Sequence, residues 1–166
     1  MKPQVTQYKK PFFSRKIIIS FRVFLIIALL DFFTKLIVKL KNISTTGHFV
    51  DINYQTNTGS LWSLFSNLSE INTIFIIASI TALVVLFLLW KKEQKYYVAF
   101  ALVLAGIFGN FLDRIMYGFV VDWIDFHFWP IFNIADSAIV IGVLFLLFIT
   151  LKSNSSKKII PKPRNR

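Results

Sequence analysis

The sequence predicts an all-α membrane protein that crosses the bilayer four times. Of its 166 residues, 55% are hydrophobic and 19 are phenylalanine, a composition that soluble domains of this length do not normally have. Four apolar runs are long enough, or nearly long enough, to cross a bilayer, which takes about 20 helical residues. The basic residues gather beyond the ends of these runs. These features favour one compact membrane unit over a chain of several domains.

The four expected spans cover residues 17–40, 71–90, 97–116 and 135–151. The first span follows a basic segment, as the apolar part of a cleavable signal peptide also does. It is too long for that role, contains charged residues and ends without a small-x-small cleavage site, so we expect a retained helix. One membrane domain over residues 1–151 is therefore expected. Residues 152–166 are rich in Lys, Pro, Asn and Ser, which predicts a disordered basic tail.

The positions of Lys and Arg predict the orientation of the chain. Fifteen of the 19 basic residues precede or begin the first span, separate the second from the third, or follow the fourth. The positive-inside rule therefore places both termini in the cytoplasm, which agrees with an even number of spans. The net charge of +11 is explained by topology and by contact with anionic membrane lipids, and we do not expect nucleic acid binding.

Two segments then face the outer side of the membrane, residues 41–70 and 117–134. In the first, polar and apolar side chains alternate over residues 49–55, which is typical of a strand. Residues 56–59 have turn chemistry, and residues 61–65 could lie in the membrane interface. A strand, a turn and an interfacial segment are thus expected from the first outward segment.

Several charged or polar residues lie within the spans. Asp31 and Lys35 are four residues apart, so they share a helix face and are expected to form a structural ion pair. Asn110, Asp113 and Arg114 share a face near the outer end of the third span. Arg114 could neutralise Asp113, or it could orient another carboxylate or hold a lipid phosphate or carbonyl. The residues themselves leave both roles open.

Asp122 and Asp136 flank one short segment and lie where two helices should meet the outer water layer. In the simpler interpretation, Asp122 is an ordinary loop residue and Asp136 is a favourable charge at a helix N-terminus that Asn133 could cap. In the functional interpretation, the two carboxyls meet. Two adjacent carboxyls do not both ionise readily, so one keeps a proton while the other acts as a base. Such a pair can activate water and protonate a leaving amine, as peptide hydrolysis requires.

Other chemistries have weaker support. The chain has no cysteine, which excludes thiolate catalysis and thiolate metal sites. Its two histidines, His48 and His127, lie in different outward segments without metalloprotease spacing, so a metal site at His127 and Asp125 is only a weak alternative. No glycine-rich phosphate loop and no nucleophile-elbow serine is present.

Four sequence boxes resemble those of lipoprotein signal peptidases, the bacterial signal peptidase II family of membrane aspartic proteases. Residues 31–35 read DFFTK and are similar to the family's D-x-x-[ST]-K box, and residues 57–62 read NTGSLW and are similar to N-x-G-A-A-[FW]. Residues 109–122 read GNFLDRIMYGFVVD, and residues 132–137 read FNIADS. These resemble the G-N-x-x-D-R…G-x-V-V-D and F-N-x-A-D-[ST] boxes, which are the more specific two. Ser60 and Leu61 depart from the family's two alanines.

The resemblance implies a role for each matching residue. Asp122 and Asp136 would form the catalytic dyad. The residues expected to bind substrate are Asn57, Gly59, Asn110, Arg114 and Asn133, and those expected to be structural are Asp31, Lys35 and Asp113. The implied fold adds a small outward-facing β-cradle and a short interfacial helix to the four transmembrane helices, both supplied by the first outward segment.

The resemblance also implies a reaction and its partners. The enzyme would remove the signal peptide from diacylglyceryl-modified prolipoproteins, cleaving before the lipidated cysteine, and globomycin-type inhibitors would bind the same site. It would need no cofactor and no metal, act as a monomer in the bacterial cytoplasmic (inner) membrane, and place its active site toward the outer face. One alternative is a small proton- or cation-coupled transporter or channel that uses Asp31, Lys35 and Asp113. Another is a non-enzymatic assembly subunit.

Overall fold

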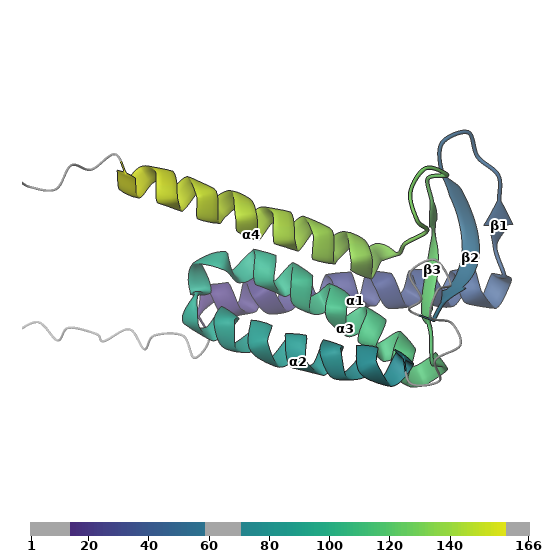
Figure 1. Cartoon of the computed structure of the whole chain (residues 1–166), viewed down its shortest axis with the longest axis horizontal. Helices are drawn as coiled ribbons and strands as arrows, with labels where there is room; N and C mark the ends of the chain where they lie inside the picture. The colour runs from purple at the N-terminus through teal and green to yellow at the C-terminus, as the bar shows by residue number, and fades with distance from the viewer. Residues whose placement is uncertain (1–13, 59–70, 159–166) are drawn as a thin grey trace, which may run out of the picture.

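The computed structural model of the chain describes residues 14–58 and 71–158, which form a helical bundle with a small sheet at one end (Figure 1). The elements, in chain order, are α1 (Arg15–Lys41), β1 (Ser44–Thr45), β2 (Asp51–Asn57), α2 (Ile71–Lys92), the short 3-10 helix η2 (Gln94–Tyr96), α3 (Tyr97–Tyr117), β3 (Val120–Asp125) and α4 (Ile134–Lys158).

The four α-helices of the described residues are each long and apolar enough to cross a membrane, which confirms the four-span prediction. The first three begin and end within two residues of the expected limits. The fourth does not, because α4 continues to Lys158. Residues 152–158, which the sequence led us to expect in a disordered tail, are therefore helical. The apolar run of α4 ends at Leu151, so hydropathy marks the end of the apolar span and not the end of the helix.

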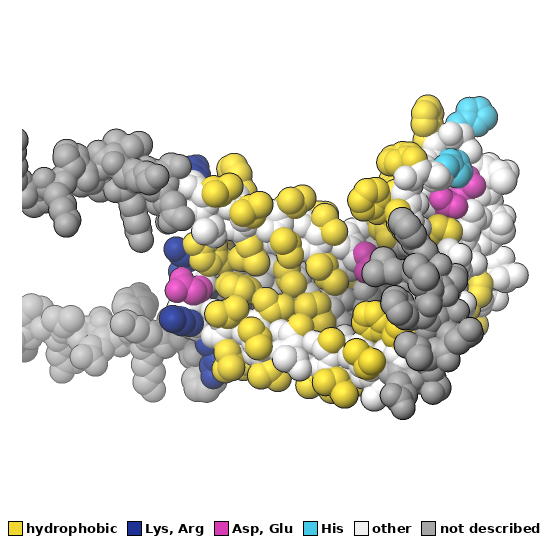
Figure 2. Space-filling view, viewed as in Figure 1, with side chains coloured by type: hydrophobic (Ala, Val, Ile, Leu, Met, Phe, Trp, Pro, Cys, Tyr) yellow, Lys and Arg dark blue, Asp and Glu magenta, His cyan; other side chains and the backbone are white. Residues whose placement is uncertain are grey.

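α3 is the central helix of the bundle and packs against α1, α2 and α4. Its buried face carries small residues, among them Ala99, Ala105 and Gly106, which let neighbouring backbones approach closely. Many large apolar side chains on the other helices point outward, as they do in a protein surrounded by lipid. Figure 2 shows this apolar surface along the bundle. The buried interior, by contrast, contains several charged and polar groups.

The two ends of the bundle differ in charge. Basic residues are exposed where α1 begins and where η2 joins α2 to α3, and Figure 2 shows them together at one end of the apolar surface. We call this the basic end, defined by Arg15, Lys16, Lys91, Lys92 and Lys95. The sheet lies at the opposite end of the bundle (Figure 1).

The sheet has three antiparallel strands in the order β1-β2-β3. β2 confirms the strand predicted from the alternating residues 49–55. However, the expectation that the first outward segment supplies the whole cradle is wrong, because β3 comes from the second outward segment. Asp122 consequently lies on a strand, opposite Gln55 of β2. Residues 61–65, which were expected in the membrane interface, lie outside the described residues, so the interfacial helix that the resemblance implies stays a prediction.

A glycine makes the passage from α3 into β3 possible. Gly118 follows the last residue of α3 with φ of 80°, a left-handed conformation that side chains with a Cβ rarely adopt. Its backbone N–H donates to the carbonyl of Arg114 and so closes the helix end. The chain can then turn directly into β3, which places Asp122 only a few residues from the end of the span.

Candidate functional site

The two aspartates come from different elements, β3 and the first turn of α4, and a compact connection brings these elements together. The backbone of Phe132 pairs with Ile124 as an isolated bridge, with N–H···O distances of 2.8 and 3.1 Å. The chain that leaves β3 thus returns to its edge before α4 begins. As a result, Asn133 and the start of α4 lie directly beside Val121 and Asp122.

Asn133 contacts both aspartates. Its amide nitrogen lies 2.7 Å from Oδ1 of Asp122, and its Oδ1 accepts from the backbone N–H of Asp136 at 2.8 Å. In return, Oδ2 of Asp136 accepts from the backbone N–H of Asn133 at 3.3 Å. This reciprocal arrangement is a capping box with aspartate at its third helical position. The helix cap that the sequence suggested is therefore present, and the same residue reaches the second carboxylate.

Two more asparagines hold the carboxylates. Asn110 of α3 donates to Oδ1 of Asp136 at 2.7 Å, and Asn57 at the end of β2 donates to Oδ2 of Asp122 at 2.9 Å. Oδ1 of Asn110 also accepts from Asn133 at 3.1 Å. The five residues therefore form one hydrogen-bonded network drawn from β2, α3, β3 and α4.

Asp122 is buried, with 3% of its surface exposed, and its neighbours do not fully compensate for the lost water. Burial raises the pKa of Asp122 to about 6, and the negative charge of Asp136 adds to this rise. The hydrogen bonds from Asn57 and Asn133 act in the opposite direction. Asp122 is therefore a carboxyl that can hold a proton at a pH where ordinary aspartates are ionised.

A second buried cluster lies beside this network and is centred on Lys35. Its ammonium lies 2.7 Å from Asp31 and 3.0 Å from Asp113, and it donates to Oδ1 of Asn110 at 3.0 Å. The predicted Asp31–Lys35 pair is thus present. The expectation that Arg114 could neutralise Asp113 is not met, because Lys35 is the partner of that carboxylate.

The two carboxylates of this cluster also hold backbone next to the aspartate pair. Asp31 accepts from the N–H of Ala135 at 2.8 Å, and Asp113 accepts from the N–H of Val121 at 3.0 Å. Each of these amides is adjacent in sequence to one of the two network aspartates, Asp136 and Asp122. The positions expected to be structural therefore set the backbone on which Asp122 and Asp136 are carried.

Arg114 lies at the edge of the site with donors to spare. One guanidinium nitrogen donates to the carbonyl of Asn110 at 3.4 Å, and the guanidinium lies 4.8 Å from the ring centre of Phe75. In the described part of the chain, buried Nε of Arg114, Oδ1 of Asn72 and Nε1 of Trp123 have no hydrogen-bond partner. Buried polar atoms are rarely left in this state, so such groups are available for a bound molecule.

Asn72 is a polar residue near this site that the sequence argument missed. It lies in the first turn of α2, and its side-chain nitrogen donates to the carbonyl of Arg114 at 3.5 Å. An amide at the outer end of an apolar span was the available signal, but it belongs to none of the four sequence boxes. Gly59, which was expected to bind substrate, lies outside the described residues.

His127 takes part in a contact within the sheet region. Its Nε2 lies 2.9 Å from Asp51, and its backbone N–H donates to Asp125 at 2.8 Å. The hydrogen bond with Asp51 raises the pKa of His127. The pKa of Asp51 is lowered, chiefly by the hydrogen bond from the backbone N–H of Gly47 and, to a smaller extent, by the one with His127. This pair joins the β1–β2 hairpin to the segment after β3.

The family model described as signal peptidase (SPase) II matches residues 23–152 of the chain. The lipoprotein signal peptidase of Staphylococcus haemolyticus (strain JCSC1435) is 40% identical over 119 residues, which cover 67% of this chain and 73% of that protein. That of Staphylococcus aureus (strain JH9) is also 40% identical over 119 residues, covering 67% and 71% of the two chains. The region that the family model matches includes the Lys35 cluster and both network aspartates.

Solved structures show the same fold. A bacterial membrane enzyme determined by the in meso method at 2.3 Å resolution aligns with a TM-score of 0.77 and 34% identity, covering 87% of this chain and 94% of the other. A second solved structure of a bacterial membrane enzyme, determined by the in meso method at 1.9 Å resolution, gives a TM-score of 0.75 and 34% identity, covering 82% of this chain and 94% of the other. The chain is therefore a multi-pass bacterial membrane protease, and it belongs to the signal peptidase II family.

Proposed function

We propose that this enzyme is an aspartic endopeptidase that removes the signal peptide from diacylglyceryl-modified prolipoproteins, cleaving before the lipidated cysteine. The observation that carries the proposal is the pair of carboxyls, Asp122 and Asp136, joined through Asn133 and Asn110 at the sheet end of the bundle. The names of the relatives support the class of substrate.

In this mechanism the two carboxyls share the work of acid and base. Asp136 takes a proton from water, and the resulting hydroxide adds to the scissile carbonyl carbon. Asp122, whose pKa is raised to about 6, acts as the acid and donates a proton to the carbonyl oxygen. The C–N bond then breaks, and the departing nitrogen receives a proton from the pair as the carbonyl reforms. The product is a free amine on the lipidated cysteine and a carboxylate on the signal peptide.

Substrate would be positioned by groups at the edge of the carboxyl network. Nε of Arg114 and Oδ1 of Asn72 have no partner within the described residues and can pair with a peptide carbonyl and a peptide N–H. Asn57, which holds Asp122 from β2, adds a further contact at the sheet. We propose that globomycin-type inhibitors occupy this same position.

The buried charges do not favour the transport alternative. A proton or cation relay needs titratable groups distributed across the membrane. Here Asp31, Lys35 and Asp113 form one cluster that is already ion-paired and that contacts Asn110 of the aspartate network. Their arrangement favours a structural role, in which the cluster holds the backbone next to the aspartate pair. We propose further that the enzyme is a monomer of the cytoplasmic (inner) membrane, with its termini in the cytoplasm and the aspartates toward the outer face.

The test uses purified enzyme with a diacylglyceryl-modified prolipoprotein and its unlipidated counterpart, followed by mass spectrometry. We expect globomycin-sensitive cleavage of the lipidated form alone. Asp122→Asn and Asp136→Asn should each reduce the rate by about 10³-fold or more, since each removes one proton-transfer group. Asp125→Asn, a carboxylate of the same strand that does not contact the pair, is the matched control. Cleavage by both dyad variants at the wild-type rate would exclude the mechanism.

A further inference from the structure

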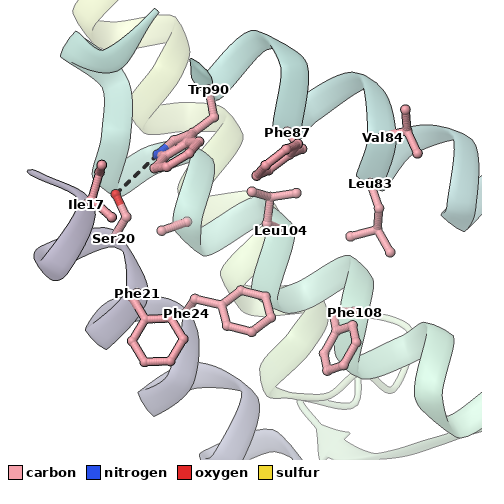
Figure 3. A pocket seen from close by; sticks show the side chains of 11 residues that line it. Ile17, Ser20, Phe21, Phe24, Leu83, Val84, Phe87, Trp90, Leu104 and Phe108 are labelled. Carbon is pink, nitrogen blue, oxygen red and sulfur yellow. Dashed lines mark hydrogen bonds between the residues drawn. The ribbon is translucent and has the colours of Figure 1, made fainter. Parts of the chain in front are cut away.

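A large apolar cavity lies in the half of the bundle away from the sheet, and none of the proposed catalytic or substrate-binding residues lines it. It has a volume of about 500 Å³ and lies between α1, α2 and α3 (Figure 3). Its lining runs from Ile17 to Phe24 on α1 and from Leu83 to Trp90 on α2, which corresponds to about 10 Å along each helix. The volume is within the range of sites that bind small organic ligands.

The cavity opens sideways toward the lipid and is polar only near the basic end. Phe21 and Val84 line it and are 62% and 54% exposed. Near its end, Nε1 of Trp90 donates to Oγ of Ser20 at 3.2 Å, and that hydroxyl donates to the carbonyl of Tyr97 at 3.3 Å. Figure 3 shows the Trp90–Ser20 bond beside the apolar lining. An occupant must therefore be apolar along its length, with its polar part at the basic end.

The basic residues at that end of the cavity favour an occupant whose polar part is negatively charged. Lys91 lies with its ammonium 5.4 Å from the ring centre of Phe87, which lines the cavity. Lys92 follows it, and Arg15 and Lys16 are exposed at the start of α1, one turn from the cavity residues Ile17 and Ser20. An anionic headgroup is attracted to this position. A signal peptide is not, because the segment before its apolar region is itself basic.

We propose that this cavity binds one acyl chain of an anionic glycerophospholipid, with the phosphate of its headgroup beside Lys91. The chain lies against Phe24, Leu83 and Leu104, and the headgroup lies among the basic residues at the ends of α1 and α2. Such a lipid fills the space between α1, α2 and α3 and adds a contact between α1 and α2.

The cavity contains its own spectroscopic probe, because Trp90 lines it. Full-length enzyme in phosphatidylcholine nanodiscs is titrated with phosphatidylglycerol or phosphatidylcholine carrying brominated chains. The Trp90 signal is the difference between wild type and Trp90→Phe. We expect saturable quenching by the anionic lipid at a lower mole fraction than by the zwitterionic one. Lys91→Gln should lower the affinity for the anionic lipid by about fivefold and leave the affinity for the zwitterionic lipid unchanged.

Native mass spectrometry gives a second readout that does not depend on fluorescence. Wild type should retain phosphatidylglycerol after delipidation, and Leu104→Trp, which fills the cavity, should lose it. Leu144→Trp on the lipid-facing side of α4 is the matched control and should retain it. Equal quenching by both lipids, or unchanged retention in Leu104→Trp, would overturn the proposal. Relief of quenching by a synthetic unlipidated signal peptide would also overturn it and would assign the cavity to the substrate helix.

Discussion

Asn133 combines two tasks that proteins usually divide between residues. It caps α4 through the backbone N–H of Asp136, and its amide nitrogen holds Asp122. The residue is completely buried, so both sets of hydrogen bonds are made in a site without water to replace them. Serine can accept the cap hydrogen bond, but it is too short to replace the amide at Asp122.

This difference predicts separate effects on stability and on rate. Asn133→Ala should destabilise the fold by about 1–3 kcal/mol, since it removes the cap and leaves buried groups unpaired. Asn133→Ser should recover about 1 kcal/mol of that loss through the cap alone. Both variants should cleave slowly, because neither holds Asp122. Thermal unfolding in detergent and steady-state rates measure the two effects. Full activity in the serine variant would show that the amide is not needed.

The raised pKa of Asp122 predicts that the difference in stability between wild type and Asp122→Asn changes with pH. Its pKa of about 6 in the folded protein exceeds the ordinary value of 3.8, so its contribution to stability is fully present below 3.8 and is lost as the pH rises through 6. The loss is on the order of 3 kcal/mol. Asp122→Asn does not titrate, so its melting temperature should exceed that of wild type at pH 8 and approach it at pH 4. A constant difference between the two proteins would contradict the raised pKa.

At the scale of elements, the helices could be predicted and the contacts between distant elements could not. Lipid selects long apolar runs, so each span is visible in its own residues. β3 pairs with β2 across more than 60 residues, and its residues 120–125 carry no clear alternation of their own. Hydropathy also could not show that α4 continues past its apolar part. These features depend on neighbours that a local pattern does not contain.

The partner of Asp113 was missed for a related reason. Asp113 and Arg114 are adjacent, and adjacent side chains on a helix do not face each other even when both lie on the same side of it. Lys35 is distant in the sequence but faces Asp113 across the α1–α3 interface. The family boxes contain residues that the structure brings together, whereas the way in which Asn133 joins the two aspartates required the fold.

The α1–α3 interface predicts a severe effect of one small substitution. A Cβ added to Gly109 would lie 2.5 Å from Oδ2 of Asp31, which is held by Lys35. Gly109→Ala should therefore displace the ion pair and cost about 1–3 kcal/mol, with a loss of activity because the start of α4 shifts. The measurement is thermal unfolding together with the rate of cleavage.

Gly118→Ala is the matched control for this experiment. Among the described residues, its two chain neighbours apart, no atom lies within 4 Å of its added Cβ, so the positive φ of 80° is what opposes the substitution. It should cost about 1 kcal/mol of backbone strain and leave the Lys35 cluster intact. Equal losses of activity in the two alanine variants would show that the ion pair does not position the site.

The whole molecule is asymmetric along the direction of its helices. The sheet and the aspartate network lie at one end, the basic residues lie at the other, and an apolar surface separates them (Figure 2). Under the proposed topology, water and the extracytoplasmic part of a substrate reach the sheet end while the bilayer surrounds the rest. The arrangement also gives the orientation of the enzyme a direct test.

Because the chain has no cysteine, a single introduced thiol reports its own location. Glu93→Cys lies between α2 and η2 at the basic end, and Phe128→Cys lies in the exposed segment after β3. In cells whose cytoplasmic membrane is closed but whose outer layers admit the reagent, a membrane-impermeant maleimide should label Phe128→Cys. It should label Glu93→Cys only after the cytoplasmic membrane is opened. The reverse pattern would invert the proposed topology.

The ion pair within α1 has a consequence for biosynthesis. Asp31 and Lys35 are one helical turn apart, so they can neutralise each other as soon as α1 forms. Asp113 is made more than 70 residues later, on α3. The Asp31–Lys35 pair can therefore enter the bilayer without net charge before its third partner exists. When α3 arrives, its carboxylate and Asn110 meet a lysine that is already inside the membrane. The order of synthesis thus lets Lys35 enter the bilayer already paired with Asp31.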